Sequence, residues 1–226
     1  MLFKRHQTFF GFPRVDVESV CRGTIAIIGS RCVSRSPHPS YGQRDSAKIL
    51  RRLSAEYEPH SMYGDVDLSC HDIVDLGDFS GRSLTEIVRS VLSSGGKTLV
   101  VGGDHTTTYF GLKKADVEKI LILDAHLDSD VCEDRIHHGC FLRKLVGERD
   151  ANICIVGYRG YSTGPSELKF LEEKGIPVLK YPVQPSIIAK TLREADAVSL
   201  DLDFFDPSSF WCVRCLLYTS DAADDG

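Results

Sequence analysis

The sequence lacks several features that would assign it to a special class of protein. No apolar run approaches the ~20 residues that span a bilayer as a helix. The N-terminal stretch "MLFKRHQTFFGFPRV" has basic residues but no apolar core typical of a signal peptide. Positive charge is not in excess, since the formal net charge is −5. These absences predict a cytoplasmic protein that binds neither nucleic acid nor a membrane.

Cysteine is abundant, with eight residues, but no export signal accompanies it. We therefore expect free thiols rather than disulfides. Cys212 and Cys215 form a C-x-x-C pair. Such a pair can be redox-active or can bind zinc, but the chain has no second pair to complete a zinc site.

Short β-branched runs recur along the chain, and a turn or an acidic cluster closes each of them. Several are continuously apolar, as strands buried on both faces of a parallel sheet are. The expected strands span 23–30, 72–78, 97–104, 119–126, 152–160, 177–182 and 197–207, and the expected helices span 44–57, 83–94, 111–119, 141–148, 164–175 and 186–195. The alternation predicts a three-layer α/β/α domain with a mostly parallel central sheet.

Two of the expected strands end in acidic clusters. Residues two apart in an extended chain point to the same side, so Asp124, His126 and Asp128 of "DAHLD" should project together. Asp201 and Asp203 of "SLDLDFFDP" repeat the arrangement. Capping of a turn explains any single aspartate, but two such clusters repel each other unless cations neutralise them. Carboxylates with an imidazole suit Mn(II) or a similar divalent ion.

The segment "VVGGDHTTT" (100–108) adds a further histidine after an apolar run. A glycine-rich loop that opens a helix can cradle a phosphate. This segment lacks the full G-x-x-x-x-G-K-[ST] pattern, so His105 is the more informative residue. Beside the two acidic clusters, it is a third source of metal ligands.

These three motifs carry a family resemblance. "GGDHT", "DAHLD" and "SLDLDFFDP", in this order and at comparable spacing, resemble the signatures of the ureohydrolase family, which comprises arginase, agmatinase and their relatives. A looser match runs from "YGQRDSAKILRRLS" through "DLGD", so the resemblance covers roughly residues 20–210. It implies an arginase-like fold and an enzyme that hydrolyses a guanidino C–N bond and releases urea.

The resemblance also implies a binuclear Mn(II) site. One ion would be held by His105, Asp124, Asp128 and Asp201, and the other by His126, Asp124, Asp201 and Asp203, with Asp124 and Asp201 bridging the two. In the family, a hydroxide shared by the two ions attacks the guanidinium carbon, and the tetrahedral intermediate collapses to urea and an amine. Asp128 resembles the residue that contacts this hydroxide and relays its proton to the leaving amine.

His138 in "RIHHGCFLRK" resembles the histidine of the family's His-Gly step, which shuttles protons or orients the substrate. Asp128 and His138 are thus the expected catalytic residues, and their separation is closer to that of agmatinases than to that of arginases. Cys140 stands where Thr or Ser is common in the family. The adjacent His137 makes it ambiguous which of the two histidines corresponds to the family's histidine. The alternatives are two surface histidines on a loop, or a zinc site formed by Cys132, His137, His138 and Cys140.

The end of the sequence departs from the family pattern. After "DPSSF", the stretch "CLLYTSDAAD" (215–224) resembles a translated sequencing adapter. We therefore expect a ureohydrolase-like domain over 1–210, incomplete at its C-terminus, and a non-native tail over 211–226. No residue is assigned as the family's guanidinium-binding acid, which would lie downstream.

The sequence thus predicts an agmatinase-like, Mn-dependent hydrolase of polyamine metabolism, which acts on a small guanidino substrate and is a homo-oligomer when full length. Arginase, guanidinobutyrase and formimidoylglutamase activities remain open. A non-catalytic metal-binding homologue, or an inactive fragment, is the alternative from a different class.

Overall fold

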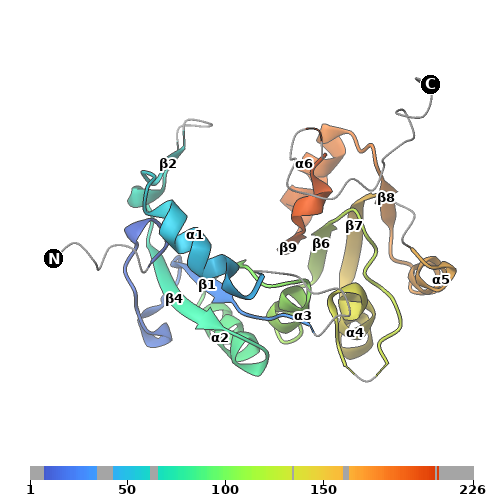
Figure 1. Cartoon of the computed structure of the whole chain (residues 1–226), viewed down its shortest axis with the longest axis horizontal. Coiled ribbons are helices and arrows are strands. Elements are labelled where there is room, and N and C mark those ends of the chain that lie inside the picture. The colour runs from blue at the N-terminus through green and yellow to red at the C-terminus, as the bar shows by residue number, and fades with distance from the viewer. Residues whose placement is uncertain are drawn as a thin grey trace, which may run out of the picture. The chain divides into compact units, whose positions relative to one another are not determined.

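A computed structural model of the chain describes residues 8–34, 43–61, 66–133, 135–159, 163–206 and 208. The chain divides into two compact units: unit 1 comprises residues 1–116 and 136–138, and unit 2 comprises residues 117–135 and 139–226 (Figure 1). The expected domain boundary at 210 and the tail 211–226 lie outside the described residues.

Unit 1 is built on a parallel sheet with the strand order β4-β1-β5. Its strands are β1 (Ile25–Ser30), β4 (Ile73–Phe79) and β5 (Lys97–Val101), and its helices are α1 (Ser46–Ser54), α2 (Arg82–Ser93) and α3 (Thr106–Leu112). Strands β2 (His60–Ser61) and β3 (Val66–Asp67) form a small antiparallel pair that the sequence did not predict.

Helices cover both faces of this sheet. Ala26 and Ile28 point to one face and belong to a core cluster with Leu84 of α2. Ile27, the residue between them, points to the other face and clusters with Ala47 of α1. Because β1 is buried on both sides, its sequence is continuously apolar rather than alternating. The three-layer arrangement predicted from the sequence is confirmed in this unit.

A buried ion-pair network joins β4 to α1 in unit 1. Arg51 donates to both oxygens of Asp75, over 2.7 and 3.0 Å, and it also pairs with Asp78. Arg14 donates to Asp75 over 3.1 Å. The carboxylate of Asp75 is fully buried, so these charged hydrogen bonds replace the water that it has lost.

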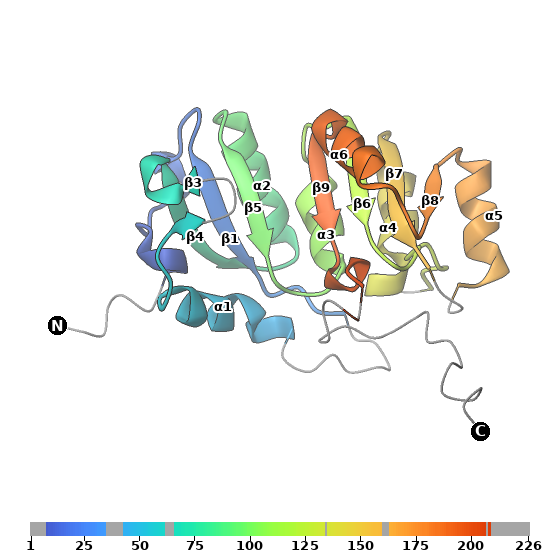
Figure 2. The ribbon, with the colours of Figure 1, turned by 90° about the horizontal axis from the view of Figure 1, so that it is seen from above.

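Unit 2 contains a second parallel sheet, with the order β8-β7-β6-β9. Its strands are β6 (Lys119–Leu123), β7 (Asn152–Tyr158), β8 (Val178–Lys180) and β9 (Ala197–Leu200), and its helices are α4 (Phe141–Glu148), α5 (Pro165–Glu173) and α6 (Pro185–Glu194). Helix α6 lies on one face, and α4 lies on the other (Figures 1 and 2). Leu121 and Leu123 of β6 cluster with Ile188 of α6.

All seven expected strands are present, but β6 and β9 end earlier than expected, at Leu123 and Leu200, and one helix was misplaced. The helix expected at 111–119 is α3, which begins earlier because Asp104 Oδ1 accepts a hydrogen bond from the N–H of Thr106 and starts the helix directly after the glycine pair. Strands β5 and β9 are not buried throughout: Leu99 and Leu200 are 52% and 47% exposed. Within the described residues, each of these strands pairs on one side only.

Among the described helices, none combines the length and the apolar character needed to cross a membrane.

Candidate metal centre

The acidic clusters of unit 2 meet at one edge of its sheet. Strands β6 and β9 are parallel neighbours, with Leu123 opposite Leu200. The N–H of Asp201 then donates to the carbonyl of Leu123 over 2.9 Å, so pairing continues one residue past β9. Because both strands run in the same direction, the residues that follow them lie at the same carboxyl edge.

Three side chains at this edge form a compact group. His126 Nδ1 is 2.9 Å from Asp203 Oδ2 and 3.6 Å from Asp124 Oδ1. One candidate ligand atom from each of the three residues lies within 4.8 Å of the other two. The side chain of Asp124 is 1% exposed, and that of Asp203 is 18% exposed. The side chain of His126 is 34% exposed, so the group is shielded from water at Asp124 and open to it at His126.

The electrostatics of this group favour a positive charge. Hydrogen bonds to Asp124 and Asp203 raise the pKa of His126 to about 11, although burial of the ring opposes the shift. Burial would raise the pKa of Asp203, but hydrogen bonding and attraction to His126 outweigh it, so the pKa of Asp203 is lowered. A cation that binds here competes with the proton on His126, because an imidazole must be neutral to ligate a metal.

The donor set of these three residues fits a hard divalent ion. Two carboxylates and an imidazole are the ligand types that Mn(II) accepts, whereas soft metals select thiolates. The structure brings together Asp124, His126 and Asp203, three of the six residues that the sequence predicted to converge, and their role as metal ligands stays a prediction.

Asp128 reaches the same region by a route that the sequence did not predict. An extended chain through 124–128 was expected, but β6 ends at Leu123. Asp128 has a φ of +45°, a left-handed conformation that is uncommon for residues other than glycine. One of its carboxylate oxygens still lies within 4.8 Å of one of Asp124. Its carbonyl accepts the N–H of Leu142 over 3.1 Å, which ties this turn to α4.

Asp201 shows the turn-capping role that was the alternative interpretation of a single aspartate. Its Oδ1 accepts the N–H of Asp203 over 3.0 Å, at the start of the turn Leu202–Phe204. This bond orients the turn that presents Asp203. A role for Asp201 as a bridging ligand stays a prediction.

Arg159 is a supporting residue that sequence reasoning missed. Its guanidinium is buried and donates to the carbonyls of Asp203, Phe204 and Phe205, so it holds the whole turn. Gly157 of β7, two residues before Arg159, has a φ of +103°, and a Cβ there would lie 2.5 Å from the ring of Phe204. The only available signal was the arginine and glycine pattern of "VGYRG" after an apolar strand.

His105 belongs to unit 1, where a tight glycine turn presents it. Gly102 and Gly103 have φ values of +96° and +77°, and a Cβ at Gly103 would lie 2.5 Å from the carbonyl of Cys32. Only glycine fits such a position. The tight turn therefore explains the two glycines of "GGDHT", and a phosphate-binding loop is not needed to account for them. His105 follows at the N-cap of α3 and is 8% exposed. Its role as a metal ligand stays a prediction.

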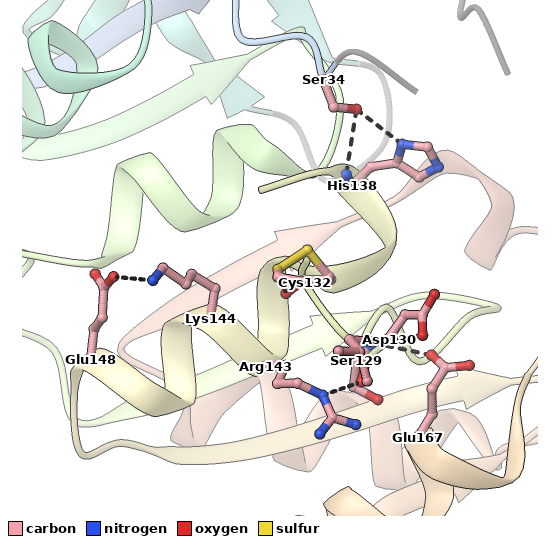
Figure 3. The surroundings of a disulfide bond; sticks show 11 residues. Ser34, Ser129, Asp130, Cys132, His138, Arg143, Lys144, Glu148 and Glu167 are labelled. Atoms are coloured by element: carbon pink, nitrogen blue, oxygen red, sulfur yellow. Dashed lines mark hydrogen bonds and ion pairs between the residues drawn. A yellow bond between two sulfur atoms is a disulfide. The ribbon is translucent and has the colours of Figure 1, made fainter. Parts of the chain in front are cut away.

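His138 opens the short turn His138–Cys140 and is half-buried. Its Nδ1 lies 3.1 Å from the hydroxyl of Ser34, as Figure 3 shows. The interpretation of His138 as a freely solvated surface residue is therefore not favoured. The ring of His137 lies 6.1 Å away, centroid to centroid.

Cys132 and Cys140 form a disulfide, so the expectation that all cysteines are free was wrong (Figure 3). Both sulfurs are used, which also rules out the alternative zinc site that included them. Around the bond, the N–H of Asp130 donates to the carbonyl of Gly139 over 2.9 Å, and Arg143 donates to the carbonyl of Ser129 over 2.9 Å. Among the described cysteines, Cys21, Cys32, Cys70 and Cys154 are free thiols.

The parallel sheets covered by helices, with an acidic and imidazole-bearing strand edge, define an α/β protein with a candidate divalent-metal centre. A sequence model of the arginase family matches residues 24–212. Since this match covers most of the chain, the protein belongs to the arginase family.

Individual relatives agree with this assignment. An agmatinase of Pyrococcus horikoshii is 25% identical over 223 residues, covering 91% of this chain and 76% of the relative. An agmatinase of Chromobacterium violaceum is 33% identical over 159 residues, covering 65% of this chain and 48% of the relative. The chain thus spans about half to three quarters of the length of these relatives.

Solved structures share the fold. The agmatine ureohydrolase of Thermoplasma volcanium has a TM-score of 0.74 to this chain at 21% sequence identity, and the match covers 92% of this chain and 74% of that structure. At this identity, the comparison supports the predicted arginase-like fold and not a particular substrate.

Proposed function

We propose that the protein is a metal-dependent hydrolase of a linear guanidino compound, which releases urea. The observation that carries this proposal is the group formed by Asp124, His126 and Asp203 at the carboxyl edge of β6 and β9, where two carboxylates hold one imidazole. A site that stabilises a positive charge at this edge fits the ion-dependent chemistry of the arginase family.

We extend this group to a set of six residues that would together hold two Mn(II) ions. The set comprises His105, Asp124, His126, Asp128, Asp201 and Asp203. When bound, the pair of ions would lower the pKa of a water molecule and so provide hydroxide near neutral pH. Membership of His105, Asp128 and Asp201 rests on the resemblance of their motifs to those of the family.

Proton transfer and substrate orientation are assigned to the protein's own side chains. Asp128 is proposed to accept a proton and pass it to the leaving amine, a transfer that a carboxylate performs and an amide does not. Its left-handed conformation and the hydrogen bond that its carbonyl accepts from the N–H of Leu142 in α4 fix the backbone that carries this carboxylate. His138 is proposed to move a second proton or to orient the substrate.

Agmatine is the substrate that we propose first, because the two relatives described above carry agmatinase names. Arginase, guanidinobutyrase and formimidoylglutamase activities are the competing substrates. The homo-oligomeric state and the role in polyamine metabolism belong to the same proposal and rest on the resemblance alone. The cytoplasmic location also belongs to it and rests on the sequence features described in the first subsection.

The test is urea release from agmatine, arginine and 4-guanidinobutyrate, and formamide release from formimidoylglutamate, each with Mn(II) supplied. We expect the fastest turnover with agmatine. In a full-length version of the protein, we expect Asp128→Asn to lose most turnover while it still binds some metal. Asp196→Asn is the matched control, because Asp196 caps the opposite end of β6 by accepting the N–H groups of Glu118 and Lys119.

Near-normal urea release by Asp128→Asn would refute the proton relay. Tight Mn(II) binding without product from any of the four compounds would favour the non-catalytic homologue or the inactive fragment instead.

A further inference from the structure

Ser34 of unit 1 lies between an aspartate and a histidine and contacts both. Its Oγ is 2.5 Å from Asp104 Oδ2 and 3.1 Å from His138 Nδ1. The N–H of Ser34 donates to the same Asp104 oxygen over 2.6 Å, and the N–H of His138 lies 3.4 Å from Ser34 Oγ. Figure 3 shows both contacts between Ser34 and His138. The hydroxyl is therefore held from two sides.

Asp104 is itself held in a defined orientation. Its Oδ1 accepts the N–H and the hydroxyl of Thr106, over 2.9 and 2.5 Å, and its own N–H donates to the carbonyl of Cys32 over 3.0 Å. The residue is 9% exposed. Because the start of α3 engages one carboxylate oxygen, the other oxygen faces Ser34 in a defined position.

The number of hydrogens available decides which atom donates and which accepts in each of these contacts. A serine hydroxyl carries one hydrogen, and a carboxylate oxygen can only accept. The hydrogen of Ser34 therefore points to Asp104, and only lone pairs of Ser34 Oγ face the ring of His138. The contact at 3.1 Å is then a hydrogen bond only if His138 Nδ1 carries the hydrogen. A neutral imidazole has one N–H, so Nε2 keeps its lone pair.

We propose that Ser34, anchored by Asp104, is a positioning residue that holds His138 in the Nδ1-protonated tautomer. This inference deepens the proposed function and rests on it, because it assumes that His138 moves a proton during hydrolysis. In this tautomer, Nε2 is the proton acceptor and the nitrogen that presents its lone pair away from Ser34. A free histidine side chain favours the opposite tautomer, so the loss of the Ser34 hydroxyl would place the lone pair on the wrong nitrogen.

The tautomer is measured directly by NMR of the whole chain with ¹⁵N-labelled histidine, free of Mn(II), at a pH where the ring is neutral. His138→Gln identifies the signals. In the unsubstituted protein, we expect a protonated Nδ1 and an unprotonated Nε2 at His138. In Ser34→Ala, we expect the pattern to reverse, and thermal unfolding establishes that this variant is folded.

The kinetic test asks whether this orientation matters for turnover. Ser34→Ala should lower kcat about 10- to 100-fold, the effect typical of residues that orient an active-site imidazole. Its KM for agmatine should stay within about twofold, since Ser34 acts through His138 rather than on the substrate. Ser34→Thr keeps a hydroxyl and should restore both the tautomer and most of kcat. Ser83→Ala, which removes a hydroxyl that donates to the carbonyl of Ser80, is the control and should change neither.

The proposal is overturned if His138 already has a protonated Nε2 in the unsubstituted protein, or if Ser34→Ala leaves the tautomer unchanged. A reversed tautomer with unchanged kcat would overturn the functional half of the inference. If no variant releases urea, including the unsubstituted chain, the proposed function fails for this chain and the inactive-fragment alternative is favoured, and the NMR comparison still decides whether Ser34 sets the tautomer.

Discussion

Units 1 and 2 both bury carboxylates beside a parallel sheet, but they compensate the charge differently. In unit 1, Asp75 receives two hydrogen bonds from Arg51 and one from Arg14. In unit 2, the carboxylates of Asp124 and Asp203 converge on the imidazole of His126. Asp75 and Asp124 are almost equally buried, at 0% and 1% exposure.

The two sites differ in whether the positively charged side chain can lose its proton and be replaced by another cation. A guanidinium keeps its proton at any physiological pH, so the Arg51 pair is a permanent part of the structure. An imidazolium can release its proton to solvent when a metal ion binds beside the carboxylates, so the group around His126 can exchange one cation for another. The network in unit 1 therefore supports the fold, and the group in unit 2 is suited to binding.

The largest expected effect comes from breaking the permanent pair. Arg51→Ala leaves Asp75 buried with less compensation, and we expect it to lower the free energy of unfolding by about 3–5 kcal/mol. Chemical denaturation measures this loss. Lys114→Ala is the control, since Lys114 and Glu86 form an exposed pair at 2.8 Å, and its removal should cost less than about 1 kcal/mol. Equal losses in the two variants would contradict the comparison.

The second prediction concerns the exchangeable group. Mn(II) at 100 times its dissociation constant should raise the free energy of unfolding by about 2.7 kcal/mol, and a chelator should reverse the gain. Asp203→Asn should remove most of this gain, whereas Asp196→Asn should preserve it. Thermal unfolding with and without Mn(II) provides the measurement. A gain that survives in Asp203→Asn would show that the metal binds elsewhere.

Removal of the disulfide in the loop after β6 should lower the free energy of unfolding by a slightly smaller amount. Cys132 and Cys140 are eight positions apart, and loop-closure entropy predicts that their bond contributes about 2.5 kcal/mol to stability. The double variant Cys132→Ser, Cys140→Ser should lose about this amount in chemical denaturation. Cys21→Ser, at an exposed free thiol, is the control and should change little. If the double variant unfolds at the same denaturant concentration as the parent, the disulfide does not stabilise the fold.

Much of the architecture could be predicted from local patterns. Continuously apolar runs marked β1, β6 and β7, since strands buried on both faces leave no polar side in the sequence. Helix α4 begins and ends at the predicted residues, Phe141 and Glu148. Helix α3 was misplaced because its start depends on the side chain of Asp104 rather than on periodicity.

The supporting contacts could not be predicted, because each joins distant parts of the chain. Arg159 holds a turn about 45 residues away through backbone carbonyls, which carry no sequence signal. The disulfide was missed because free thiols were expected from the lack of an export signal, and the sequence does not say which thiols lie close together.

The sequence by itself determined the family, the order of the strands along the chain and the residue types at each strand end, because these depend on composition and short-range spacing. Only the tertiary structure decided which of these residues meet. His126 contacts Asp203 because β9 pairs beside β6. Ser34 reaches Asp104 and His138 across separations of 70 and 104 residues. Parallel pairing and loop closure bring such groups together, and neither leaves a local pattern in the sequence.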